Sequence, residues 1–233
     1  MHAIRLLPFI LLLLIGLQTF GQICLNDVEF DRISQYKVQE YIHTQQESGI
    51  ESFNDIKPSV YANETVKGYF TRENEYQINK DIEDVWNLYI KTDATKLWNG
   101  KKISFGFLYS KKEDRLVYHD DSISKIDTGM IVYLNLRLMS GLKNMATAFE
   151  FINIDYKNKV IEFSYLSGNL SEGKQRIQFL STPKGNTRIL HTSYYRSNNV
   201  FKNYILYPYF HTRTTNEFHR NLKRTMTRDL TGL

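Results

Sequence analysis

The histidines are the side chains of this sequence that could most readily do acid–base or metal chemistry, because an imidazole ring changes its charge near neutral pH. His191 lies in the segment Arg188–Ser197, whose composition predicts a strand. From a strand it could orient the polar group of a ligand or act as a general acid–base group. A histidine on the outer face of the sheet, or one satisfied by its neighbours, is the simpler interpretation.

The other histidines and the carboxylates near them do not predict a metal site. His211 and His219 are eight residues apart in a predicted helix. They therefore lie about 80° apart around the helix axis, a poor arrangement for one ion. His119, Asp120 and Asp121 fall at the end of a predicted hairpin, where a solvated turn is the simpler interpretation. We expect no metal.

Arg137, together with Tyr133 and Asn135, could form a polar patch for an anionic group, although a solvent-facing sheet surface explains the same residues.

The sequence lacks a G-x-S-x-G elbow, a P-loop and a dinucleotide-binding fingerprint. The usual signatures of hydrolases, kinases and dehydrogenases are therefore missing. We expect no cofactor and no nucleic-acid partner.

The hydrophobic period of the sequence changes between Tyr76 and Asp93, which marks the first of the secondary-structure elements that position these residues. The residues before Asn79 read as an extended segment. After it, apolar residues recur with the spacing of one helix face, at Ile82, Val85, Trp86, Tyr89 and Ile90. Asn79 or Asp81 can accept hydrogen bonds from the first free N–H groups of the helix. A strand is therefore predicted to run directly into an amphipathic helix.

About six strands are predicted to follow. Turn residues separate three hairpins, which pair 103–110 with 115–121, 145–156 with 160–166, and 173–181 with 188–197. The segment 129–140 alternates between an apolar face and a second face that carries Ile131, Tyr133, Asn135 and Arg137. We expect this second face to be wetter.

The register of the last hairpin decides which residues face inward. If Thr182 pairs with Thr187 across the turn, Thr192 and Tyr194 share a face with the apolar residues of the preceding strand. A slip of one residue would place His191 there instead. The sequence leaves this register open.

The segment Thr212–Leu230 reads as a long final helix. Its apolar stripe is narrow, and polar residues extend it: Phe218, Leu222 and Met226, with Thr214 and Thr215. A helix packed wholly against a dense core normally shows a wider apolar face. Threonines on the inner side are tolerable where a helix faces a cavity that holds water or a ligand.

This order of elements resembles the START-like (SRPBCC) helix-grip superfamily, which includes lipid-transfer domains, polyketide cyclases and pollen allergens. The residues that carry the resemblance are Ile78–Asp93, the hairpin Gly173–Tyr195 and the final helix, and it covers roughly Tyr69–Met226. The resemblance implies an α+β fold in which a curved antiparallel sheet wraps around the long C-terminal helix and leaves a cavity between them.

Such a cavity predicts a binding site, and an aromatic content of 14% fits a lined cavity as well as a set of strands. The predicted ligand-binding residues are Phe163, Tyr165, Ile177, Phe179, His191, Thr192, Tyr194, Phe218 and Leu222. We expect a binding protein for a hydrophobic or amphipathic, lipid-like small molecule. The alternatives are a cyclase- or aromatase-type enzyme that uses the same cavity, and a structural envelope protein whose cavity its own side chains fill.

The first residues predict export. Arg5 precedes an apolar stretch over residues 6–17, and Thr19 and Gly21 stand at positions −3 and −1 of a plausible cleavage site. We therefore expect a signal peptide over residues 1–21. An N-terminal extension over 22–67 and one helix-grip domain over 68–233 would follow.

Two other interpretations of the N-terminus fit less well. A retained membrane anchor needs about 20 apolar residues, more than this stretch offers. A lipid-modified Cys24 would require a small residue before it, where Ile23 stands. Since Cys24 is the only cysteine, the fold has no internal disulfide. An exported protein without disulfides is ordinary in bacteria, so we expect a secreted or periplasmic bacterial protein.

The net charge of +5 is uneven, with a local excess of +3 from His211 to Leu233. A basic terminal helix could contact an anionic membrane peripherally. A solvated helix face is the simpler interpretation.

Overall fold

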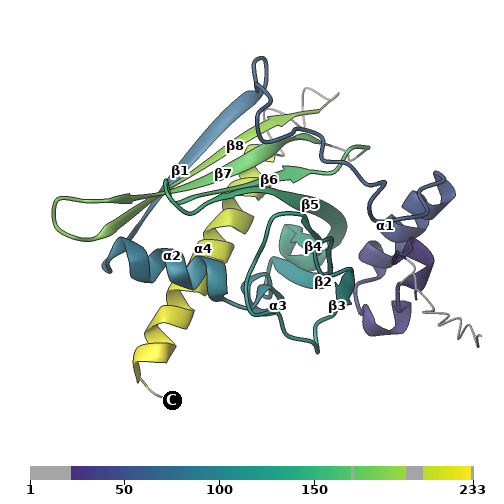
Figure 1. The fold of residues 1–233 in the computed structure, drawn as a ribbon, viewed down its shortest axis with the longest axis horizontal. Coiled ribbons are helices and arrows are strands. Elements are labelled where there is room, and N and C mark those ends of the chain that lie inside the picture. The colour runs from purple at the N-terminus through teal and green to yellow at the C-terminus, as the bar shows by residue number, and fades with distance from the viewer. Residues whose placement is uncertain (1–21, 169–170, 198–206, 232–233) are drawn as a thin grey trace, which may run out of the picture.

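The computed structural model describes residues 22–168, 171–197 and 207–231, and contains one antiparallel sheet of eight strands in the order β1-β8-β7-β6-β5-β4-β2-β3 (Figure 1). The strands are β1 (Phe70–Ile78), β2 (Ile103–Ser110), β3 (Arg115–Val117), β4 (Met130–Leu138), β5 (Lys143–Asp155), β6 (Val160–Tyr165), β7 (Glu172–Ser181) and β8 (Thr187–Arg196). The helices are α1 (Tyr36–Glu47), α2 (Ile82–Lys91), α3 (Ala94–Leu97) and α4 (Tyr207–Thr231), with 3-10 turns η1 (Leu25–Asp27), η2 (Phe30–Arg32) and η3 (Met139–Gly141). The three predicted hairpins are β2–β3, β5–β6 and β7–β8.

The strand-to-helix transition forms as the sequence predicts. β1 ends at Ile78, and α2 begins at Ile82 directly after Asp81. The Asp81 carboxylate accepts a hydrogen bond from the Glu83 N–H at 2.7 Å, which satisfies a free donor of the first turn. The apolar face of α2 is buried in the core between the sheet and the helices.

The long helix α4 runs across one face of the sheet (Figure 1). The core on this inner face joins apolar residues of α2, α3 and α4 to residues from the strands. The sheet is open rather than closed into a barrel, because β1 and β3 are its two edges. The architecture is the α+β arrangement that the resemblance implied, a curved antiparallel sheet around a C-terminal helix.

Residues 22–67 build a second core on the outer face of β2, β4 and β5. Val38 and Ile42 of α1 and the following Phe53 are fully buried there. Ile131 and Tyr133 of β4 are fully buried beneath them. The expectation of a wetter face on β4 was therefore wrong at these positions, because the extension covers them.

Gly106 allows α1 to pack close to the sheet in this second core. It lies at a β-bulge between Phe105 and Phe107, where the register of β2 against β4 shifts. A Cβ atom at Gly106 would lie 2.9 Å from the Tyr133 carbonyl oxygen and 3.0 Å from Val38 Cγ1. Any side chain there would push α1 away from the sheet.

The predicted signal peptide, residues 1–21, lies outside the described residues. Within the described ranges, no helix is long and apolar enough to cross a membrane.

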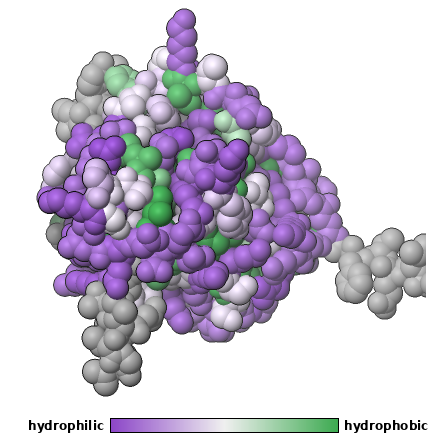
Figure 2. Space-filling model, turned by 60° about the vertical axis from the view of Figure 1, so that its left-hand side comes forward, coloured by the Kyte–Doolittle hydropathy of each residue, from purple (hydrophilic) through white to green (hydrophobic). Residues whose placement is uncertain are grey.

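On the face shown in Figure 2, hydrophilic residues cover most of the surface and hydrophobic residues gather only in small groups. Most large apolar side chains are in the two cores.

Candidate functional site

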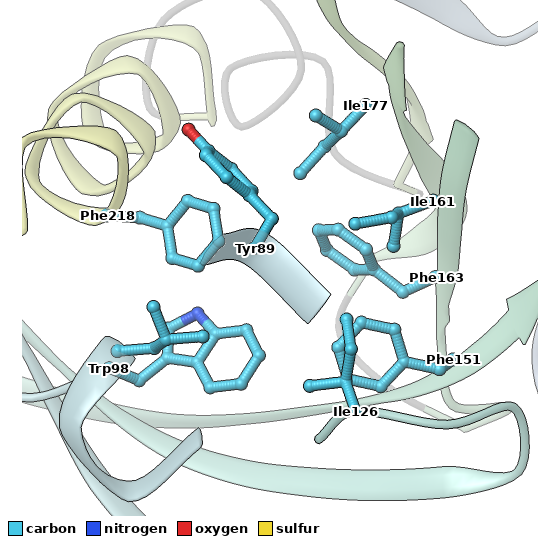
Figure 3. Close-up of a pocket in the computed structure, with 9 residues that line it drawn as sticks. Tyr89, Trp98, Ile126, Phe151, Ile161, Phe163, Ile177 and Phe218 are labelled. Carbon is cyan, nitrogen blue, oxygen red and sulfur yellow. The ribbon is translucent and has the colours of Figure 1, made fainter. Parts of the chain in front are cut away.

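The space between α4 and the sheet, where we predicted a ligand cavity, is almost filled by side chains. A cavity of about 10 Å³ remains, enough for about one water molecule. The ring of Trp98 stacks on that of Phe218 with 5.5 Å between centroids. Figure 3 shows that Phe218 and Trp98 face Phe163 and Phe151 across the remaining space. The lining residues are Tyr89, Leu97, Trp98, Ile126, Phe151, Ile161, Phe163, Ile177 and Phe218.

Five of the predicted ligand-binding residues belong to this inner core. Phe163, Ile177 and Phe218 line the small cavity. Phe179 and Leu222 are buried in the surrounding core. The structure thus brings the predicted apolar residues together, but it packs them against one another. Their contact with a ligand stays a prediction.

The register of β7 against β8 settles which way His191 points. Ser181, not Thr182, pairs with Thr187, so His191 lies opposite Ile177. The N–H of Thr182 instead donates to the carbonyl of Asn186 within the turn at 2.8 Å. The one-residue slip that the sequence left open is therefore the observed arrangement, and it turns His191 inward.

The same register moves two predicted residues out of the inner site. Thr192 and Tyr194 alternate with His191 along β8 and lie on the outer face of the sheet. The Thr192 hydroxyl donates to the carboxylate of Glu73 on the neighbouring strand at 3.1 Å. Tyr165 is on the inner side, where its hydroxyl accepts a hydrogen bond from Gln175 Nε2 at 2.9 Å.

A chain of buried hydrogen bonds connects α2, α4, β8 and β7 beside the apolar cavity. The Tyr89 hydroxyl is 2.7 Å from His219 Nδ1, and His219 Nε2 is 2.8 Å from His191 Nδ1. His191 Nε2 is 2.7 Å from the Gln175 side-chain oxygen. His211 Nε2 is 2.9 Å from that same oxygen. His191 and His211 thus meet at one glutamine oxygen, and His219 joins the chain through His191.

For uncharged rings, the hydrogen-bond partners give one consistent placement of the protons. A carboxamide oxygen only accepts, so the Nε2–H groups of His191 and His211 both donate to Gln175. A neutral imidazole has one N–H, so His191 Nδ1 accepts from His219 Nε2–H. His219 Nδ1 then accepts from the Tyr89 hydroxyl. Both nitrogens of His191 are therefore used by the protein itself.

A larger pocket lies outside the inner core, between the first turns of α4, the α3–β2 loop and the end of β4. Its volume is about 280 Å³. Eight residues line it, and we call it the basic pocket: Lys101, Lys102, Arg137, Leu138, Met139, Phe210, Arg213 and Thr214. None of them is in the predicted set of ligand-binding residues, but Arg137 was considered in a patch for an anionic group. Its two companions in that patch, Tyr133 and Asn135, are buried and do not line the pocket.

Glu217 of α4 holds one wall of the basic pocket in place. Its two carboxylate oxygens accept hydrogen bonds from the backbone N–H groups of Lys101 and Lys102, each at 2.6 Å. Gly100 makes room for this contact, since a Cβ atom there would lie 2.6 Å from a Glu217 carboxylate oxygen. Arg137 donates to the Gly100 carbonyl at 3.3 Å, which ties the loop to β4 as well.

The basic pocket combines four cationic side chains with apolar ones. Within the described part of the chain, none of Lys101, Lys102, Arg137 and Arg213 forms an ion pair. The Arg213 guanidinium lies over the ring of Tyr209, 4.0 Å from its centroid, which orients it. Four cations against the one carboxylate of Glu217, beside a concave and partly apolar surface, favour an anion with an apolar part.

Comparison with known proteins supports the architecture. No protein-family profile and no curated protein matches the sequence. Among solved structures, the chain is similar to ginseng major latex-like protein 151 from Panax ginseng, with 13% identity, coverage of 68% of this chain and 98% of that one, and a TM-score of 0.50. It is also similar to truncated norcoclaurine synthase from Thalictrum flavum, with 14% identity, 70% and 97% coverage, and a TM-score of 0.51. The chain has the START-like helix-grip fold.

In this helix-grip protein the inner histidines are uncharged. Burial, followed by the neighbouring histidine rings, lowers the pKa of His191 well below its usual value. Burial is also the main cause that lowers the pKa values of His211 and His219 to about 3. Burial raises the pKa of Tyr89 well above its ordinary range. The cluster is thus a neutral, hydrogen-bonded unit at physiological pH.

Sequence reasoning missed Tyr89, Gln175, His211 and His219 as one unit. It assigned Tyr89 to the apolar face of a helix and weighed the two helix histidines only as metal ligands. In the described ranges, no group of three or more histidine, cysteine or acidic residues could hold a metal ion. The available signal was the partly polar stripe of α4, whose inner side also carries both histidines.

Acid should destabilise this protein through the buried histidines. Their pKa values are lowered in the folded state, so the unfolded chain binds more protons below pH 6.5. The free energy of unfolding should therefore fall as the pH drops from about 6.5 towards 3, by up to about 1.4 kcal/mol per pH unit for each histidine. Urea unfolding from pH 7.5 to 4 measures this slope.

The variant His219→Gln should lower the pH dependence of the free energy of unfolding by about 1.4 kcal/mol per pH unit, because one fewer proton is taken up on unfolding. The control is His119→Gln, because the His119 side chain is 60% exposed and lies outside the inner core. If His219→Gln kept the slope of the unaltered protein, the buried neutral cluster would not be the source of the acid sensitivity.

Proposed function

We propose that this protein binds an amphipathic small molecule with an acidic group, and that the basic pocket is its site. The carrying observation is the placement of four cationic side chains, none in an ion pair with another described residue, around Leu138, Met139 and Phe210. Cationic side chains form strong, charge-assisted hydrogen bonds to a carboxylate or phosphate. The apolar side chains offer a surface for a short hydrocarbon part.

The two volumes favour the basic pocket over the interior as the binding site. The inner cavity of about 10 Å³ has no room for a ligand while α4 is packed as described. The basic pocket, at about 280 Å³, is close to the lower end of ordinary ligand sites, about 300 Å³. This size suits a compact amphiphile, such as a medium-chain fatty acid. We therefore propose the basic pocket, and not an internal cavity, as the site of the lipid-like ligand that the sequence suggested.

The structural neighbours support a small-molecule function in general terms. One structure of norcoclaurine synthase from Thalictrum flavum is a point mutant in complex with a transition state analogue, and it matches this chain with 14% identity and a TM-score of 0.51. A protein of this fold therefore accommodates a small molecule. At this identity the likeness concerns the fold alone, so it does not carry the identity of the ligand.

The hydrogen-bonded chain Tyr89–His219–His191 is the one observation in favour of the alternative, a cyclase- or aromatase-type enzyme. A substrate would have to displace Gln175 to reach His191 Nε2. It would also have to separate α4 from the sheet, because only about 10 Å³ is free there. Binding in the basic pocket requires neither change, so we favour the binding protein.

We also propose that the protein is exported, to the periplasm or the outside of a bacterial cell. The charged and apolar pattern of residues 1–21 supports this, and the contacts of the residues that follow are compatible with cleavage. Ile23 already donates its backbone N–H to Asp114 at 3.3 Å, and Leu25 is fully buried. Cleavage after Gly21 would therefore leave every one of these contacts in place.

Calorimetry with decanoate tests the binding site. We expect decanoate to bind and Arg213→Gln to weaken its binding about tenfold, the effect of losing one charge-assisted hydrogen bond. Decanol, which has the same chain but no charge, should bind weakly and equally to both proteins.

The matched control is Lys184→Gln, which removes an exposed cation from the β7–β8 turn. Equal binding of decanoate and decanol would refute an acidic group as the recognised feature. Unchanged decanoate binding by Arg213→Gln would place the site elsewhere.

Expression of the full chain in a bacterium tests export. We expect the protein in the periplasmic fraction or the medium, with the intact mass of a chain that starts at Gln22. An intact chain in the cytoplasm would contradict the proposal. A mass increased by acyl chains on Cys24 would show a lipid anchor in place of simple cleavage.

A further inference from the structure

We propose that the tip of the β4–β5 hairpin, residues 138–143, docks the protein on a membrane that contains anionic phospholipid. The first observation is exposure. Six large hydrophobic side chains are exposed in the described part of the chain, and four of them are tyrosines, whose hydroxyls suit water. The other two are Met139, 61% exposed, and Leu142, 87% exposed. Both lie at this tip.

The tip is an ordered turn. Leu138 pairs with Lys143 across the end of the two strands, and the Leu142 N–H donates to the Met139 carbonyl at 3.3 Å. Met139 has a φ of 49°, a left-handed conformation that unbranched bulky residues rarely adopt. The chain thus holds an exposed methionine in an unfavourable backbone conformation.

The charge around the tip matches an anionic surface. Arg137 and Lys143 flank it and are exposed. Lys101, Lys102 and Arg213 line the basic pocket, which shares Arg137 and Met139 with the hairpin. The sequence has no acidic residue between Asp127 and Glu150. Basic residues are attracted to anionic lipid headgroups, and apolar side chains enter the interface between headgroups and acyl chains.

A membrane fits this surface better than a protein partner does. The tip projects the flexible side chains of Met139 and Leu142 beside the exposed cations Arg137 and Lys143, the combination that a lipid headgroup region accepts. The sequence had suggested α4 for a peripheral membrane contact, since it is basic. Among the described side chains of α4, however, Tyr209 is the only exposed large hydrophobic, so the helix lacks the aliphatic anchors that the hairpin has.

Docking goes beyond the proposed function, and it would place the basic pocket next to the bilayer. An acidic amphiphile could then pass between the lipid and the pocket along the surface formed by Arg137, Leu138 and Met139. The two proposals can fail separately, because Leu142 belongs to the tip and not to the pocket lining.

Vesicle flotation with the mature chain, residues 22–233, tests the docking. We expect binding to phosphatidylcholine vesicles that contain 30% phosphatidylglycerol, weak binding to phosphatidylcholine alone, and loss of binding in high salt. Leu142→Ser should reduce the bound fraction at least about tenfold, since it removes the larger apolar anchor. Met139→Ser should act in the same direction.

Two controls complete the design. Tyr61→Ser removes an exposed hydrophobic side chain away from the tip, 50% exposed, and should leave vesicle binding unchanged. The pair Arg220→Gln and Arg224→Gln, on exposed positions of α4, should reduce it less than Leu142→Ser does. The proposal is overturned if the unaltered chain ignores anionic vesicles, if Leu142→Ser binds normally, or if only the helix variants lose binding. Decanoate binding by Leu142→Ser, measured by calorimetry, should stay normal.

Discussion

The packing of aromatic rings between α4 and the inner face of the sheet is the interaction on which the rest of this structure depends. Trp98 of the segment after α3 stacks on Phe218 of α4, and Phe149 and Phe151 of the sheet meet Trp98 edge-on or tilted. Phe163 of the neighbouring strand meets Phe151 edge-on. Edge-to-face and offset contacts of this kind stabilise a core beyond the burial of area alone. Because these rings fill the interior, the room for a guest lies instead at the basic pocket beside the first turns of the helix.

Hydrogen bonds fix the same helix on its other side. Tyr89 reaches α4 from α2, and His191 and Gln175 reach it from the sheet, so α4 is held at His219 and His211 by groups from three elements. A buried polar network is stabilising only when its members are satisfied, and then it specifies one arrangement. The threonines that suggested a wet cavity are not members of this network: the hydroxyls of Thr214 and Thr215 donate to the His211 carbonyl within α4 at 2.9 and 3.0 Å. Glu217, one residue before the stacked Phe218, extends the helix contacts to the loop of the basic pocket.

The sequence predicted the order of elements and the fold, because hydrophobic period and turn residues are local signals. It could not predict the register of β7 against β8, since one residue of slip exchanges His191 for Thr192 and both patterns are plausible strands. It also could not show that residues 22–67 cover β4, because their weak helical pattern carries no sign of its partner. The basic pocket was out of reach for a related reason. Its cations come from positions 101–102, 137 and 213, which only the folded chain brings together.

The central claim is that a guest binds outside the aromatic interior, at the basic pocket. A methyl-detected NMR titration with decanoate tests it most directly, in protein labelled at isoleucine, leucine and methionine methyl groups. Our account predicts that the signals of Leu138 and Met139 shift with decanoate while those of Ile161 and Ile177, which line the small inner cavity, stay in place. Shifts at Ile161 and Ile177 with Leu138 and Met139 unchanged would contradict it, because they would show that α4 lifts from the sheet to admit the ligand.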